Sequence, residues 1–82
     1  MEYKIFYKSS VEKDLKRIDF KQRKNIMDCI ENDIAKGIKG KKLKGEYEGM
    51  YSYRTGNYRI VYTQIPQGIL ILRISHRKDV YK

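Results

Sequence analysis

The sequence predicts an α+β fold in which an N-terminal strand and a helical hairpin are followed by a three-stranded antiparallel meander, with the helices packed on one face of the sheet. Two observations predict it. Apolar residues recur at helical spacing between residues 11 and 34. From residue 51 onwards, β-branched and aromatic residues gather in runs that turn residues interrupt. At 82 residues the chain is expected to form one domain, residues 1–82.

Residues 50–62 predict two strands around a tight turn. Gly56 and Asn57 supply the positive φ angles that a two-residue hairpin needs, and this turn sets Arg54 directly opposite Arg59. Because side chains alternate along a strand, one face carries large residues and is expected to meet the helices. Its members are Tyr51, Tyr53, Tyr58, Ile60 and Tyr62. The open face carries Ser52, Arg54, Arg59 and Val61.

The predicted pairing of Arg54 with Arg59 points to a ligand. Like charges directly opposite each other in a hairpin repel, by a few tenths of a kcal/mol up to about 1 kcal/mol. A polyanion such as a nucleic-acid backbone would remove this penalty. The whole chain has a net charge of +9 and a pI of about 9.7, which also favours a polyanionic partner. An acidic protein partner, or a role of the charge in solubility, is the alternative.

The N-terminal region predicts one strand and two helices. The first strand spans residues 2–7, and its core side carries Tyr3, Ile5 and Tyr7. A first helix is expected to have Ser9 or Ser10 as its N-cap and to end near Ile18. A second helix is expected to begin after Asp19 and to stop at Gly37. Its apolar stripe consists of Phe20, Ile26, Met27, Ile30 and Ile34.

Residues 36–45 predict a basic loop, because their three glycines disfavour a helix and their charges disfavour a core strand. Four of its lysines are candidate RNA-binding residues that would contact phosphates: Lys39, Lys41, Lys42 and Lys44. A solvated loop without a ligand is the alternative. After a turn at residues 66–68, residues 69–74 form a nearly continuous apolar run, which is typical of a strand covered on both faces.

The single cysteine, Cys29, excludes an intramolecular disulfide, and the sequence shows no cluster of metal ligands. We therefore expect no metal and no cofactor. Cys29 lies beside the apolar stripe of the second helix, so it is expected to be a small core residue rather than a nucleophile. No apolar run approaches the roughly 20 residues that span a bilayer, and no signal peptide is recognisable. These features predict a cytoplasmic protein without a membrane partner.

Three segments resemble, in order and spacing, the RelE/ParE superfamily of toxins from prokaryotic toxin–antitoxin pairs. They are residues 42–45, residues 51–62 and residues 75–81, so the resemblance covers nearly the whole chain. It implies a RelE-like fold. It also implies either a RelE-like endoribonuclease that cuts messenger RNA on the ribosome or a ParE-like inhibitor that binds gyrase without chemistry. Both kinds of toxin are neutralised by an antitoxin that wraps around them, and a basic toxin is expected to have an acidic one.

The resemblance assigns roles to four residues. Arg59 matches the arginine that contacts the scissile phosphate in the family. Tyr81 matches a tyrosine near the reacting nucleotide. His76 and Arg77 fall in the segment where family members carry basic catalytic residues.

The chain also departs from the family pattern. Met50 and Ser52 stand where the best-known RelE toxin has two lysines, so the base proposed for that toxin is absent here. Arg54 is the nearest substitute. In an ungapped alignment Ser75 stands where that toxin has an arginine.

RNA cleavage by attack of its own 2′-hydroxyl needs no metal. It needs a base at the 2′-oxygen, cationic donors on the phosphate and an acid at the leaving 5′-oxygen. Arginine suits the phosphate role because its planar fork donates two hydrogen bonds and keeps its charge. Arg59 is therefore the first candidate for the phosphate clamp, with Arg54 and Arg77 in support. A solvated strand position is the alternative for Arg54.

Proton transfer has two main candidates. His76 has an unperturbed pKa of about 6.5, which suits both directions of transfer near neutral pH, while a histidine bonded to backbone at a strand end is the alternative. Tyr81 suits base stacking or proton donation, and packing on the sheet is its alternative. Glu46 and Glu48 are alternative bases, but they are expected to lie in a solvated loop.

Overall fold

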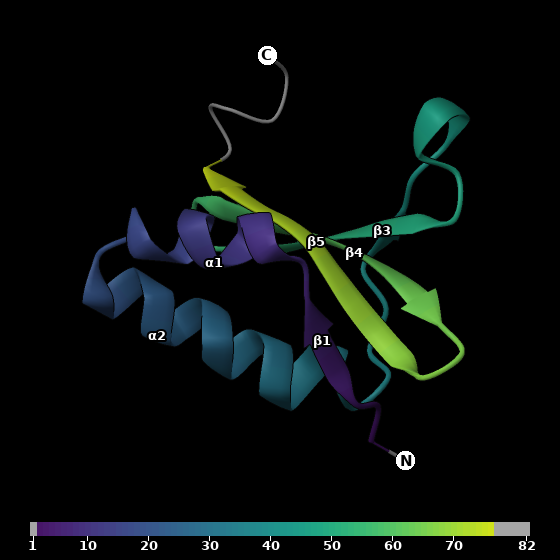
Figure 1. Ribbon diagram of the computed structural model, residues 1–82, viewed down its shortest axis with the longest axis horizontal. Helices are drawn as coiled ribbons and strands as arrows, with labels where there is room; N and C mark the ends of the chain where they lie inside the picture. Colours follow the sequence, from purple (N-terminus) through teal and green to yellow (C-terminus); the bar gives the residue numbers. More distant parts are fainter. Residues whose placement is uncertain (1, 77–82) are drawn as a thin grey trace.

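The computed structural model describes residues 2–76, and in it two helices pack on a five-stranded sheet (Figure 1). The strands are β1 (Ile5–Tyr7), β2 (Lys41–Lys42), β3 (Met50–Thr55), β4 (Tyr58–Ile65) and β5 (Gly68–His76). They lie in the order β1-β5-β4-β3-β2, with β1 parallel to β5 and every other pair antiparallel. The predicted α+β class and the meander, which is β3 to β5, are confirmed.

The hairpin of β3 and β4 has the predicted two-residue turn. Arg54 pairs with Arg59, and Tyr53 pairs with Ile60. Gly56 has a φ of 58°, a left-handed conformation that a glycine adopts without steric cost. Asn57 does not have a positive φ, so the prediction was wrong for this second turn residue, and Gly56 alone supplies the left-handed conformation. The predicted division of the hairpin into two faces therefore holds.

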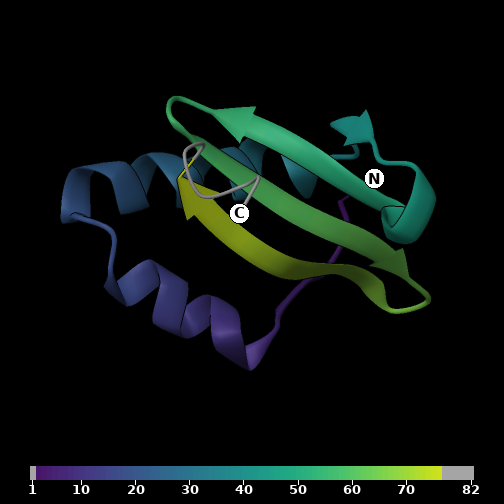
Figure 2. The same ribbon diagram turned by 90° about the horizontal axis from the view of Figure 1, so that it is seen from above.

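The two helices are α1 (Ser9–Lys16) and α2 (Phe20–Cys29), and a turn of π-helix (Ile30–Ile34) extends α2. Figure 2 shows both helices on the same side of the sheet, where α1 contacts β5 and α2 contacts β3. The predicted stop at Gly37 is confirmed. Its N–H bonds the carbonyl of Ile34, and the N–H of Ile38 bonds that of Asp33, which is the Schellman pattern of a helix end.

One predicted member of the α2 stripe does not belong to it. Phe20 is 73% exposed, whereas Ile26 is buried. At about 100° per residue, Phe20 lies about 120° around the helix from Ile26, so it points away from the core. The prediction for Phe20 was therefore wrong, because the residue is apolar but out of phase.

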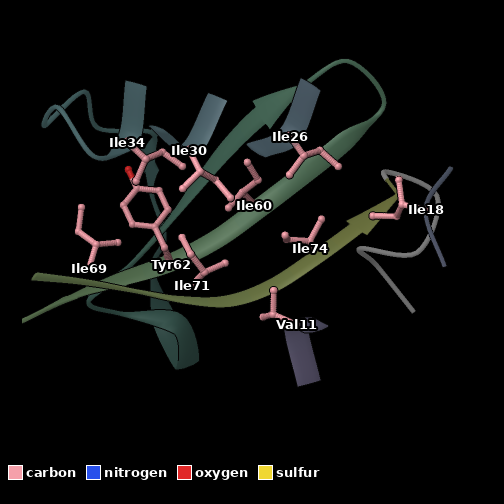
Figure 3. Packing of buried hydrophobic residues seen from close by; sticks show 10 residues of the cluster. All are labelled: Val11, Ile18, Ile26, Ile30, Ile34, Ile60, Tyr62, Ile69, Ile71 and Ile74. Carbon is pink, nitrogen blue, oxygen red and sulfur yellow. The ribbon is translucent and has the colours of Figure 1, made fainter. Parts of the chain in front are cut away.

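The core lies between the helices and one face of the sheet (Figure 3). The buried residues of this cluster are Val11, Ile18, Ile26, Ile30, Ile34, Ile60, Tyr62, Ile69, Ile71 and Ile74. Tyr51, Tyr53 and Tyr58 pack against it, as predicted. A core made largely of isoleucine suits a sheet, since β-branched side chains fit its pleated surface.

The strand β5 is buried on one face, not on both as its apolar run predicted. Leu70 and Leu72 are partly exposed, and Arg73 is exposed. A bulge explains why apolar residues follow one another here. Tyr62 pairs with Ile71 while Val61 pairs with Arg73, so Leu72 is the extra residue without a partner.

The basic loop contains a short edge strand that the sequence did not predict. In this strand, β2, Lys41 pairs with Ser52 of β3. The preceding Gly40 donates its N–H to the hydroxyl of Tyr62 at 2.8 Å. A Cβ at Gly40 would lie 2.3 Å from the carbonyl oxygen of Ser52, so only glycine allows this approach. Glycine in this loop thus brings the loop against the sheet instead of leaving it in solvent.

A side chain of α1 covers the edge of β5. Strand β1 pairs with β5 only as far as Ile71. Beyond that point, the N–H of Ile74 donates to Oδ2 of Asp14 at 3.4 Å. The carboxylate takes the place of a neighbouring strand at this donor. No helix in residues 2–76 has the length and apolar character needed to cross a membrane.

Candidate nucleic-acid interface

The face of the sheet opposite the helices carries two rows of polar and basic residues. In the first row, Arg54 pairs with Arg59, and Arg59 pairs with Ser75. Arg54 is exposed and Arg59 is partly buried. Directly paired residues share a face, so both guanidinium groups belong to the open side. The structure therefore brings together the two arginines that the sequence singled out.

The second row crosses four strands, from β2 through the meander to β5. Lys41 pairs with Ser52, Ser52 with Val61, and Val61 with Arg73. The next row along the strands is uncharged and consists of Met50, Thr63, Leu70 and Phe6. None of the residues in these three rows is acidic. Within residues 2–76, the three rows thus carry four cations and no carboxylate, which suits a polyanionic ligand.

Arg73 was not among the predicted site residues. Its signal in the sequence was that it interrupts an otherwise apolar run at residues 69–74. A charged residue inside such a run marks the face of the strand that is not covered. The structure confirms that Arg73 is exposed, and the register places it on the same side as Arg54 and Arg59.

His76 lies on the other face of the sheet from Arg59. It pairs with Tyr58, and the next pair along, Ser75 with Arg59, points to the opposite side. The rings of Tyr58 and His76 meet edge to face with their centroids 5.2 Å apart. His76 thus lies at the end of β5, beside the helix-side core and not among the open-face arginines. Arg77 and Tyr81, the other two predicted site residues of the C-terminal segment, lie outside the residues that the structure describes.

The four lysines of the predicted basic patch do not share one surface. Lys41 pairs with Ser52 on the open face, whereas Lys42 pairs with Tyr51 on the helix side. The ammonium of Lys39 lies 5.8 Å from the centroid of the Tyr51 ring, in a cation–π contact that is also on the helix side. Lys44 is exposed and precedes a 3₁₀ turn, Gly45–Tyr47. Only Lys41 extends the open-face rows.

The two candidate glutamates are distant from the arginine pair. Glu46 and Glu48 are exposed, as predicted for a solvated loop, and they precede Met50, the first residue of β3. Arg54 lies at the other end of that strand. Four residues of strand span about 13 Å, so neither carboxylate is placed to exchange protons at the arginine pair.

Cys29 has the chemistry of a structural thiol. It is partly buried, and its Sγ donates to Oδ2 of Asp33 at 3.7 Å. Tyr53 donates to the same oxygen at 2.7 Å. Burial and the neighbouring Asp33 carboxylate raise the pKa of Cys29 to about 11. The reactive thiolate is therefore scarce at neutral pH, which agrees with a packing role.

Comparison with known proteins places the chain in a family. A family model described as the ParE toxin of the type II toxin–antitoxin system parDE matches residues 5–81. The chain belongs to the RelE/ParE superfamily of toxins. Toxin RelE3 of Methanocaldococcus jannaschii is 36% identical over 86 residues, which cover 95% of this toxin and 94% of the relative. Toxin RelG of Mycobacterium tuberculosis is 27% identical and covers 100% of this toxin and 99% of the relative.

Solved structures show the same fold. The toxin resembles a chain of the Mycobacterium tuberculosis toxin–antitoxin complex RelBE2, with a TM-score of 0.85 at 25% identity and coverage of 96% and 95% of the two chains. It matches the RelB–RelE complex from Methanococcus jannaschii with a TM-score of 0.70 at 31% identity, over 93% and 94% of the chains. A mutant of the E. coli toxin RelE in the free state shares the fold, with a TM-score of 0.76 at 16% identity over 98% and 88% of the chains.

Proposed function

We propose that this toxin is an endoribonuclease that cleaves messenger RNA on the ribosome. The observation that carries the proposal is the facing pair Arg54 and Arg59 on an open sheet face whose three rows contain no acidic residue. Such a face holds a phosphate between two guanidinium groups. The similarity to toxins named RelE3 and RelG favours the nuclease over gyrase inhibition.

In the proposed reaction the 2′-oxygen of the substrate attacks the adjacent phosphorus, and the bond from phosphorus to the 5′-oxygen breaks. Arg59 and Arg54 donate hydrogen bonds to the phosphate oxygens, where negative charge grows in the transition state. A proton leaves the 2′-hydroxyl and another reaches the departing 5′-oxygen. We assign these transfers to the C-terminal segment, with Tyr81 as the first candidate and Arg77 as a further cation. His76 is the second candidate, although its ring lies on the other face of the sheet from Arg59.

We infer that an acidic antitoxin is the regulatory partner. The support is twofold: the net charge of +9 and the solved relatives, two of which are toxin–antitoxin complexes. An acidic chain laid over the open face would neutralise the arginines and exclude RNA. Binding of the antitoxin to the folded toxin would also stabilise it by mass action.

A paired assay tests the proposal. Purified toxin is added to a translating extract, and cleavage of messenger RNA is mapped by primer extension, while a separate sample is tested for inhibition of gyrase supercoiling. We expect cuts within codons on translated messages and no effect on gyrase. Inhibition of gyrase without any cleavage would contradict the proposal and support the ParE-like function that the name of the matching family model suggests.

A further inference from the structure

A cleft with basic and aromatic residues in its lining lies at the edge of β5, apart from the arginine pair. It has a volume of about 420 Å³ and lies between the end of α1 and the ends of β4 and β5. Its lining residues include Asp14, Arg17, Tyr58, Arg73, Ser75 and His76. The cleft lies where β5 extends beyond its pairing with β1, which ends at Tyr7, and where α1 packs against β5.

The polar groups in the cleft favour an anion. Arg17, which directly follows α1, and Arg73 from β5 line it together, and both residues are exposed. Among the described residues that line the cleft, the one carboxylate is Asp14, which accepts the N–H of Ile74. Two guanidinium groups from different elements therefore outnumber one carboxylate that already has a backbone partner. Arginine is the side chain best suited to hold a phosphate at such a site.

The aromatic groups in the cleft favour a base. Tyr58 and His76 meet edge to face, with ring centroids 5.2 Å apart, and both line the cleft. Single-stranded RNA is commonly held by stacking of its unpaired bases on aromatic rings beside a basic groove. The arginines of the cleft suit the phosphate of a nucleotide, and its aromatic rings suit the base.

The cleft continues from the open face. Ser75 lines it and is also the direct partner of Arg59 across β4 and β5. Adjacent strands lie about 4.8 Å apart, so the cleft begins one strand spacing from the proposed phosphate clamp. Arg73 belongs to both surfaces, since it pairs with Val61 in the second row and lines the cleft.

We propose that this cleft binds a nucleotide of the RNA chain next to the one that is cleaved, with its phosphate between Arg17 and Arg73 and its base against Tyr58 and His76. The inference rests on the proposed nuclease function. It adds a site whose role is to bind and align the RNA, so its loss is expected to weaken binding more than it slows the chemical step.

The test measures binding and cleavage separately. Binding uses a short 2′-O-methyl RNA, which lacks the attacking hydroxyl and stays intact, over a series of salt concentrations. We expect Arg17→Ala and Arg73→Ala each to weaken binding about tenfold and to lower the slope of log K against log salt by about 0.7, the value for one lost phosphate contact on a single strand. Arg17→Lys, which keeps the charge, should recover most of the slope. Lys16→Ala is the matched control, because Lys16 is an exposed cation on the same helix that does not line the cleft.

The outcomes are distinct. The cleft would not be an RNA site if both arginine variants kept the wild-type salt slope, or if Lys16→Ala weakened RNA binding as much as they do. Either result would leave the proposed nuclease activity untouched. Tighter binding of a free nucleoside 5′-monophosphate than of the RNA would assign the cleft to a free nucleotide and overturn the RNA site. Absence of cleavage by wild type would defeat the nuclease, and weakened RNA binding by Arg17→Ala would then still support the cleft.

Discussion

The hydroxyl of Tyr53 donates a hydrogen bond to Oδ2 of Asp33 at 2.7 Å and so ties β3 to the π turn that ends the second helix. Loss of a hydrogen bond to a carboxylate of this kind costs about 1 to 2 kcal/mol. We therefore expect Tyr53→Phe to lower the free energy of unfolding by that amount, measured by urea denaturation at neutral pH. Tyr47→Phe is the control, because Tyr47 is 57% exposed and lies on the 3₁₀ turn. Equal losses in the two variants would contradict a specific role for Tyr53.

Tyr53 and Cys29, which both bond Asp33, predict a loss of stability at high pH. The hydrogen bond to Asp33 and burial raise the pKa of Tyr53 from 10.0 to about 12, and burial beside Asp33 raises that of Cys29 from 9.0 to about 11. The unfolded chain therefore releases these protons at lower pH than the folded chain does. Their contribution is intact below pH 9 and is lost as the pH rises to about 12. Unfolding curves of wild type and Tyr53→Phe should converge between pH 10 and pH 12, and a constant gap would exclude the linkage.

Removal of the phosphate clamp should abolish most cleavage. In the proposed reaction Arg59 donates to the developing charge on the phosphate, and loss of one such donor, as in Arg59→Ala, costs about 10²–10³-fold in rate. Arg54→Ala should cost less, about tenfold, because Arg54 is exposed and its hydrogen bonds are weakened by water. Single-turnover cleavage in the translating extract measures both. Lys21→Ala, an exposed change on α2, should cleave like wild type. Full cleavage activity of the Arg59→Ala variant would show that Arg59 is not part of the phosphate-binding site.

A substitution that keeps an aromatic ring at residue 76 separates a role of His76 in proton transfer from a role in packing on Tyr58. His76→Phe retains an aromatic partner for Tyr58 but transfers no proton. If His76 is the general acid or base, we expect a loss of about 10²–10⁴-fold in the cleavage rate and a change in the shape of the pH–rate profile. An unchanged profile in His76→Phe, together with reduced stability in His76→Ala, would instead show a structural role.

Two adjacent lysines form a matched pair for RNA binding. Lys41 lies on the open face with Ser52, whereas Lys42 lies on the helix side with Tyr51. We expect Lys41→Ala to weaken RNA binding and to lower its salt slope by about 0.7, and Lys42→Ala to leave both nearly unchanged. Fluorescence anisotropy with a 2′-O-methyl RNA provides the comparison. Equal effects of the two variants would indicate that RNA binding depends on the overall positive charge and not on a defined binding surface on the open face.

The fold was largely predictable because its strongest signals are local. The Gly56 and Asn57 turn fixes the register of β3 and β4, and register decides which side each of their residues faces. The sequence could not place β1, since nothing in residues 5–7 reveals that they pair with β5, more than 60 residues away. It also missed β2, where a charged pair of lysines joins an edge through backbone bonds that no side-chain pattern reports.

The site was predictable only in part. Arg54 and Arg59 come from one hairpin, so their pairing follows from the turn. His76 was grouped with them by resemblance, and the pairing of β4 with β5 shows that it faces the other way. The cleft could not be predicted, because it depends on the fold placing Arg17, just after the first helix, and Arg73 of the last strand around the same cleft. Contacts between distant segments leave no local trace in the sequence.

The carboxylate of Asp14, bonded to the N–H of Ile74, has a consequence for assembly. An unpaired donor at the rim of a sheet invites a strand from another molecule, which is the usual route to domain swapping and fibres. At this rim the donor is already occupied by a side chain that carries negative charge. A strand from a second toxin molecule would have to displace this carboxylate before it could pair with Ile74, so the Asp14 side chain disfavours the joining of two sheets at this position.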